Sequence, residues 1–206
     1  SITEGLLGLD EAEVGMFRGI QIWPFAISII LFSLIIDKVG YKFAMIFAAA
    51  SQIIWGIMGI YGLSVADTNP ELAKGLLFWG GLILALGNGT VEAFINPVVA
   101  TMFDKDKTKW LNILHAGWPG GLVIAGIAVI AMGGFSWEAK LGLIFIPAIM
   151  YLVMLVRCQF PVQERVAAGV SYRDMLAEFG FGGAAVVAFL MFLQLDGFFP
   201  GHATTW

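Results

Sequence analysis

The sequence predicts an all-α integral membrane protein with six transmembrane helices. The composition supports this class, because 59% of the 206 residues are hydrophobic and only 13% are charged, whereas soluble domains average about 45–50% apolar and about 25% charged residues. Six segments are also apolar enough to cross a bilayer core, which takes roughly 20 helical residues. These segments do not alternate between apolar and polar residues, so a β-barrel is not indicated.

The six predicted spans are separated by short polar loops. They are Gly19–Ile36, Phe43–Leu63, Leu76–Phe103, Leu111–Met132, Leu141–Val156 and Phe181–Phe199. The fifth span is the shortest, and we expect Trp137 and Tyr151 to anchor it at the two membrane interfaces. Residues 1–17 precede the first span and are predicted to form an acidic external loop.

The distribution of Lys and Arg predicts the topology. Residues 37–42, 104–109 and 157–178 together hold eight of the 11 basic residues. Because cytoplasmic loops carry an excess of Lys and Arg, these three segments are predicted to be cytoplasmic. The chain is therefore expected to be a multi-pass protein of the plasma (inner) membrane, with its first span running from outside to inside.

The first cytoplasmic loop carries a recognisable pattern, SLIIDKVGYK, over Ser33–Lys42. It resembles the signature between the second and third helices of the major facilitator superfamily, with Ser33 and Tyr41 as departures from it. The resemblance implies a conformational charge lock, which opposite charges at a helix end can provide reversibly. Its residues here would be Asp37, Lys38, Gly40 and Lys42. The alternative is a tight loop whose Lys residues only set the topology.

This resemblance implies a partial major-facilitator helical bundle, with the six spans as helices two to seven of twelve. Residues 1–158 would be the first half without its first helix, and 181–206 would begin the second half. Residues 159–180 would link the halves, and Ser171 with Asp174 there indicates either the cap of a short surface helix or a capped turn within a plain linker. We therefore expect the chain to be a piece of a longer protein.

Three polar residues interrupt the third span, within GNGTVEAFINP at residues 87–97. Asn88, Glu92 and Asn96 follow an i, i+4, i+8 spacing and should share one helix face. A charged side chain at mid-membrane costs roughly 2.5–3.5 kcal/mol, so this face should line the bundle interior or a water-filled cavity. We expect Gly87 and Gly89 to loosen the helix and Pro97 to end it. Glu92 is then a candidate proton carrier, or else a packing residue hydrogen-bonded to a neighbour.

Two motifs, EAFINP at 92–97 and LNILH at 111–115, resemble the fucose and glucose permease branch of the superfamily. That branch comprises proton-coupled sugar importers, and its helix-four Glu carries protons. Glu92 matches that residue, whereas His115 stands in place of a Gln and Trp118 in place of a sugar-binding Asn. The resemblance therefore implies proton coupling more strongly than sugar specificity.

Further polar and aromatic residues of the spans are candidates for the same site. His115 either shares protons with Glu92 or packs against a backbone carbonyl, and a role as a haem or pigment ligand has no other support. Candidate solute contacts are Asn88, Asn96, Asn112, Gln21 and Trp118. Gln52 and Trp55 are candidate cavity-lining residues, and Asp196 lies near the outer end of the last span.

The sequence favours a transporter over an enzyme. It contains no nucleophile, phosphate-binding or metalloprotease motif, and we expect no cofactor and no metal. Its net charge of −4 does not suggest nucleic acid binding. The expected function is proton-coupled secondary transport of a small polar solute by alternating access, with sugars as candidates. Expected partners are that solute, protons, the lipid bilayer and the rest of the chain. The alternative is a non-transporting scaffold subunit within a larger membrane complex.

Overall fold

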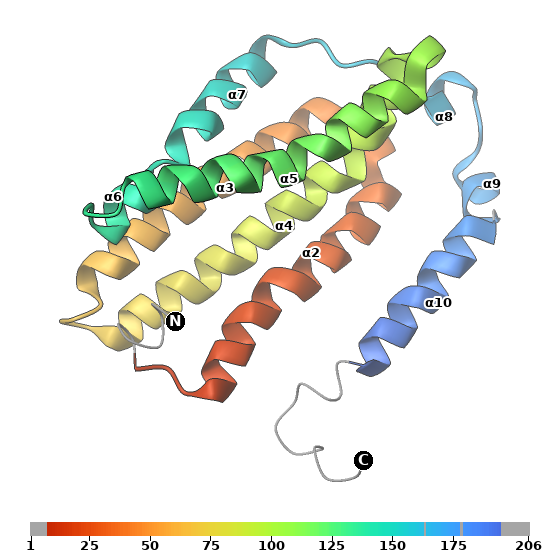
Figure 1. The fold of residues 1–206 in the computed structure, drawn as a ribbon. Helices are drawn as coiled ribbons and strands as arrows, with labels where there is room; N and C mark the ends of the chain where they lie inside the picture. Colours follow the sequence, from red (N-terminus) through yellow and green to blue (C-terminus); the bar gives the residue numbers. More distant parts are fainter. Residues whose placement is uncertain (1–7, 163, 178, 195–206) are drawn as a thin grey trace.

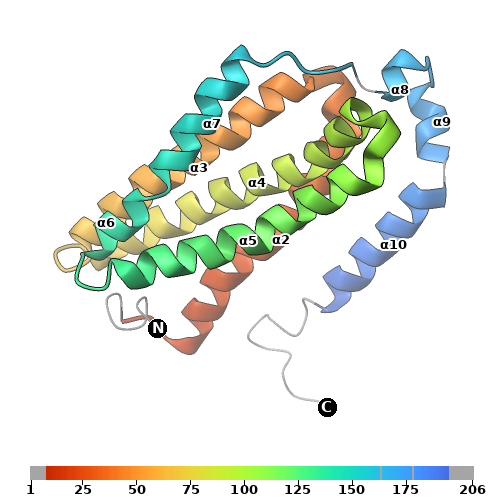
Figure 2. The same cartoon turned by 45° about the horizontal axis from the view of Figure 1, so that its top comes forward.

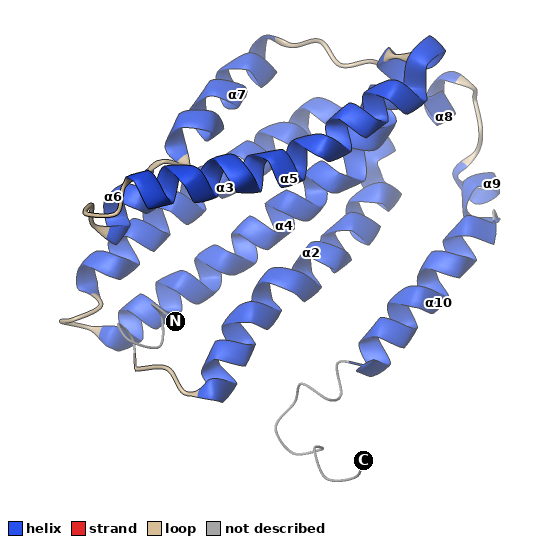
Figure 3. Ribbon diagram, in the orientation of Figure 1, coloured by secondary structure: helices blue, strands red, loops and turns tan. Residues whose placement is uncertain are grey.

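The computed structural model describes residues 8–162, 164–177 and 179–194. Within these ranges every regular element is a helix (Figure 3), which confirms the all-α prediction there. The elements are α2 (Glu11–Val39), α3 (Tyr41–Val65), α4 (Pro70–Met102), the 3-10 turn η1 (Asp104–Asp106), α5 (Lys107–Ala131), α6 (Trp137–Gly142), α7 (Phe145–Arg157), α8 (Glu164–Ala167), α9 (Tyr172–Ala177) and α10 (Phe179–Gln194).

Five helical segments among the described residues are long and apolar enough to cross a membrane. They are α2, α3, α4, η1 with α5, and α6 with α7. This finding indicates a multi-pass membrane protein. The sixth predicted span overlaps α10, but residues 195–199 of that prediction, including Asp196, lie outside the described residues.

Helix α2 begins earlier than the sequence predicted. Asp10 caps it: the Glu13 backbone N–H donates to Asp10 Oδ1 at 2.7 Å, and the Asp10 N–H donates to Glu13 Oε2 at 3.0 Å. This reciprocal capping box satisfies two backbone donors and starts a helix among polar residues. The prediction of a loop is therefore wrong from Glu11 onward, whereas the external location of these residues stays a prediction.

The fifth predicted span is not one continuous helix. Leu143 and Ile144 separate α6 from α7, and their N–H groups donate three residues back, to Lys140 and Leu141. Pro147 follows in the first turn of α7 and has no N–H to donate to the Leu143 carbonyl, which accepts from the Ile146 N–H at 3.2 Å instead. The span is therefore a short helix and a longer one joined by a tight turn.

Helix α4 packs between α2 and α3, and α7 lies along α3 (Figures 1 and 2). The largest buried side chain of this bundle is Phe94 of α4, which is fully buried. Its ring meets those of Phe32 and Tyr41 edge to face, with centroids 5.8 and 6.0 Å apart. Ala44 of α3 is buried in the same cluster as Phe94, and a small residue there allows the helices to approach closely.

Helices α5 and α10 contribute little to this core. Helix α5 contains no buried residue, although it follows α4 directly and crosses in front of it in Figure 1. Helix α10 follows α9 and stands apart from α2, α3, α4 and α7 in both views (Figures 1 and 2). The packed unit that positions the candidate site is therefore α2, α3, α4 and α7.

Candidate functional site

The two glycines near the middle of α4 allow close helix packing. A Cβ atom on Gly89 would lie 2.3 Å from the Phe25 carbonyl oxygen of α2, and one on Gly87 would lie 2.5 Å from Ser51 Cβ of α3. Helix α4 is also continuous through both positions. Each glycine is therefore required where a neighbouring helix comes too close for a side chain, and the expectation that the two loosen the helix stays a prediction.

The face of α4 that meets α2 is polar but internally satisfied. Ser28 Oγ donates to the Leu86 carbonyl at 2.6 Å and lies 3.2 Å from Thr90 Oγ1, which donates to the same carbonyl at 2.7 Å. Ser28 and Thr90 are fully buried. This cluster fixes α2 against α4 and leaves no free group for a solute.

A second set of polar side chains joins three helices by hydrogen bonds. Tyr151 of α7 donates its hydroxyl proton to Gln52 Oε1 of α3 at 2.8 Å, and Gln52 Nε2 donates to Asn88 Oδ1 of α4 at 3.3 Å. All three side chains are half-buried. Gln52 therefore does more than line a cavity, and Tyr151, which was expected only to anchor an interface, belongs to the same polar chain.

Glu92 and Asn96 continue this polar face of α4 beyond Asn88. The Glu92 side chain is exposed, and its Oε1 accepts a hydrogen bond from Asn96 Nδ2 at 3.4 Å. Asn96 Oδ1 is buried without a hydrogen-bond partner among the described residues. A buried acceptor of this kind costs about 1–3 kcal/mol unless a donor reaches it. The face therefore presents both a carboxylate and an acceptor that still requires a donor.

Pro97 does not end α4, contrary to the sequence expectation. The helix continues to Met102, and Thr101 Oγ1 donates to the Pro97 carbonyl at 2.8 Å. The proline ring removes only the hydrogen bond to the Ala93 carbonyl, one turn earlier. Glu92 consequently lies within a continuous helix, about 27 Å along its axis from Lys74 and about 15 Å from its end at Met102.

The candidate residues of α5 are not brought to this face. Asn112, His115 and Trp118 are all exposed, and no hydrogen bond joins His115 to Glu92 within the described part of the chain. Gly117 and Gly121 of the same helix would have no atom within 4 Å of an added Cβ. Proton sharing between His115 and Glu92 therefore has no contact to support it. Gln21 of α2 is likewise exposed, and its Cγ lies 4.0 Å from the Cβ position of Gly81.

One residue of the predicted charge lock, Lys42, contacts a backbone carbonyl, and the lock itself stays a prediction. Gly40 adopts a φ of +80° and its N–H closes α2 by donating to the Ile36 carbonyl at 2.7 Å. Lys42 Nζ then donates to the Val156 carbonyl, at the end of α7, at 2.9 Å. The Lys38 side chain is exposed, and the Asp37 side chain lies outside the described residues. Lys42 thus ties the start of α3 to the carbonyl end of α7, where a cation is favoured.

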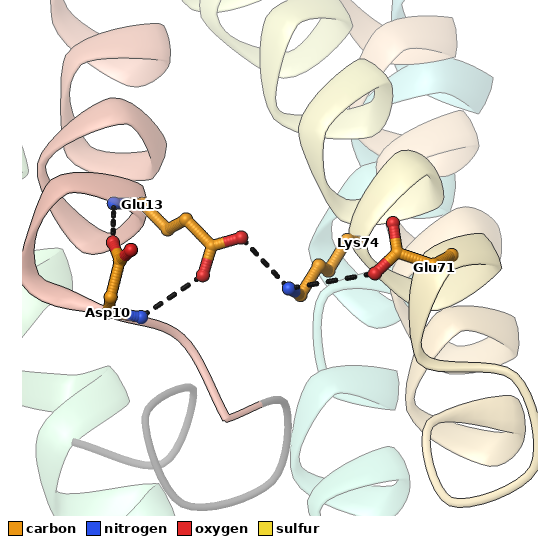
Figure 4. A network of polar contacts seen from close by, with 4 residues as sticks. All are labelled: Asp10, Glu13, Glu71 and Lys74. Atoms are coloured by element: carbon orange, nitrogen blue, oxygen red, sulfur yellow. Dashed lines mark hydrogen bonds and ion pairs between the residues drawn. The ribbon is translucent and has the colours of Figure 1, made fainter.

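Charged residues also connect the N-terminal ends of α2 and α4 (Figure 4). Lys74 Nζ lies 2.9 Å from Glu13 Oε1 and 3.7 Å from Glu71 Oε1. Glu13 is at the same time half of the capping box with Asp10. The sequence signal for this network is the acidic residue three positions after Asp10, which lies outside the apolar spans.

The arrangement supplies hydrogen-bond donors, acceptors and one carboxylate. Among the described residues, no three His, Cys, Asp or Glu side chains come together as metal ligands would. Comparison with known proteins adds no family: no family model, curated protein or solved structure matches this chain. The resemblance to the major facilitator superfamily therefore stays a prediction from the motifs.

Proposed function

We propose that this chain is part of a proton-coupled secondary transporter that moves a small polar solute, with sugars as candidates, by alternating access. The observation that carries the proposal is the polar face of α4, where Asn88, Glu92 and Asn96 lie beside two faces that are packed against α2 and α3. Ionisable residues at membrane depth are expensive and usually functional. The motif resemblance independently supports the same residue, Glu92.

In the proposed cycle Glu92 takes a proton when its face is open to one side of the membrane and releases it when the face opens to the other side. The neutral carboxyl is the form that crosses the closed state, because a bare charge there is costly. The solute accepts hydrogen bonds from Asn88 and donates one to Asn96 Oδ1, the acceptor for which the described residues supply no donor. Reversible packing of the cytoplasmic helix ends, including the Lys42–Val156 contact, would accompany the change.

The test uses the complete protein that contains this chain, reconstituted in proteoliposomes with an imposed pH gradient. Uptake of radiolabelled D-glucose and L-fucose is measured for wild type, Glu92→Gln and Glu71→Gln. Glu71 is the matched control, since it lies on the same helix but is exposed in its first turn. We expect Glu92→Gln to lose proton-driven accumulation and keep solute exchange. Intact proton-driven uptake in Glu92→Gln would show that Glu92 is not the proton carrier.

A second candidate function is that of a non-transporting scaffold subunit. The open faces of α5 favour it, because Gly117 and Gly121 are four residues apart and small residues at this spacing are typical of helix–helix interfaces in membranes. Under this proposal other subunits cover α5. Copurification in fixed stoichiometry with further membrane proteins, together with no uptake by the reconstituted complex, would support the scaffold over the transporter.

A further inference from the structure

We propose that Tyr151 and Gln52 are positioning residues of the solute site, which fix the end of the Asn88 amide that faces the solute. This inference rests on the proposed transport function and deepens it. Neither residue is on the polar face of α4, and the two come from helices α7 and α3. They act on the site only through Asn88.

The hydrogen-bonded chain has a direction. The Tyr151 hydroxyl donates to Gln52 Oε1, so the Nε2 end of Gln52 faces Asn88 and donates to its Oδ1. In the reverse order the Gln52 amide would donate to the phenol oxygen, and the Tyr151 proton would need another acceptor. A side-chain amide can rotate to present either end. The phenol proton therefore selects one of the two orders.

The selected order determines what Asn88 presents. With Oδ1 held by Gln52, the Nδ2 amino group is the end of Asn88 that remains for a solute. Glu92 lies one helical turn further along the same face, about 5.4 Å along the axis. The site therefore places N–H donors beside a carboxylate. This pair suits a solute with an oxygen acceptor next to a hydroxyl or amide donor.

The charge of the surrounding helices is consistent with an uncharged solute. Between Lys74 and Met102 on α4, Glu92 is the single charged residue, and the α3 sequence after Lys42 has none up to Val65. An anion beside Glu92 would meet a like charge without a basic partner on these two helices, which disfavours it. Hydrogen-bond direction, rather than charge, is then the means of selecting the solute.

The experiment compares the effect of Tyr151→Phe in the wild-type protein with its effect in the Asn88→Ala variant. Tyr151→Phe removes the hydroxyl and keeps the ring, so packing against α3 is retained. Uptake of radiolabelled D-glucose and L-fucose by the reconstituted complete protein gives KM and the maximal rate for wild type, Tyr151→Phe, Asn88→Ala and the double variant. Gln52→Leu is a second variant that interrupts the same hydrogen-bonded chain, at the residue between Tyr151 and Asn88. Tyr61→Phe is the matched control, because Tyr61 is exposed on α3.

We expect Tyr151→Phe and Gln52→Leu to raise KM about three- to tenfold, the effect of losing one uncharged hydrogen bond, with the maximal rate unchanged. Tyr151→Phe should add nothing in the Asn88→Ala background, because its effect passes through Asn88. A KM that Tyr151→Phe leaves unchanged, or an effect that persists fully without Asn88, would overturn the inference while transport itself stands. Wild-type protein that takes up neither sugar would overturn the proposed sugar transport and this inference with it.

Discussion

Substituting Gly89 with Ala should separate α2 from α4. The added Cβ would lie 2.3 Å from the Phe25 carbonyl oxygen and 2.7 Å from Ser28 Cβ. The first of these atoms is backbone, so it cannot rotate away, and restoring an ordinary contact requires a shift of about 1 Å between the helices. Overpacking of this kind costs about 1–3 kcal/mol. The shift also strains the two Ser28 contacts, at 2.6 and 3.2 Å, each worth about 0.6 kcal/mol in a membrane.

The better helix propensity of Ala offsets up to about 1 kcal/mol of this loss, so the net destabilisation is about 1–3 kcal/mol. Gly75→Ala is the control in the same helix, since no atom lies within 4 Å of its added Cβ. Thermal unfolding of the purified protein in detergent should place Gly89→Ala below wild type and Gly75→Ala at or above it. If Gly89→Ala unfolds at the temperature of Gly75→Ala or higher, the close approach of α2 and α4 at Gly89 is wrong.

Two further predictions address the ends of the helices. Lys74→Gln removes the 2.9 Å contact with Glu13. The melting temperature of this variant should lie slightly below that of wild type at low salt and match it at molar salt, because salt screens ion pairs near the surface. An equal difference at both salt concentrations would show a packing effect instead. Cys158 is the single cysteine of the chain and is exposed. A membrane-impermeant maleimide should therefore label it in inside-out vesicles and not in intact cells, and the opposite result would reverse the predicted topology.

The sequence located the apolar parts of the helices well, and their ends less well. Apolarity predicts where a helix meets lipid, but a helix can continue into water on its own backbone hydrogen bonds. Helix α2 does so from Glu11, because Asp10 and Glu13 cap it. That pair is visible in the sequence as an acid followed three positions later by Glu, so helix-start rules applied to the polar flank would have found the true beginning.

The break between α6 and α7 could not be predicted from apolarity either. Leu143 and Ile144 are as apolar as the residues around them, so a hydropathy window passes over them without a change. Pro147 was the usable signal, because a proline lacks the N–H that a helix interior needs and is tolerated in a first helical turn. A helix beginning just before Pro147 was therefore predictable, whereas the length of α6 was not.

The candidate site was predictable on one helix and not between helices. The spacing of Asn88, Glu92 and Asn96 predicts a shared face from α-helical geometry alone, and the contact between Glu92 and Asn96 agrees with it. The contact between Gln52 and Tyr151 joins residues 99 positions apart. No local period encodes such a pair, because it depends on how α3 and α7 are packed.

The stretch GNGTVEAFINP divides the surface of α4 among its neighbours. Gly87 meets α3, Gly89 and Thr90 meet α2, and both contacts are too close or too well hydrogen-bonded to admit a ligand. The face of α4 that is turned away from these two contacts carries the exposed carboxylate of Glu92 and the Asn96 oxygen, for which the described residues supply no donor. Because α2 and α3 already hold α4 in place, this last face is not needed to build the bundle. Its polar residues are the ones to which the proposed transport function assigns a solute and a proton.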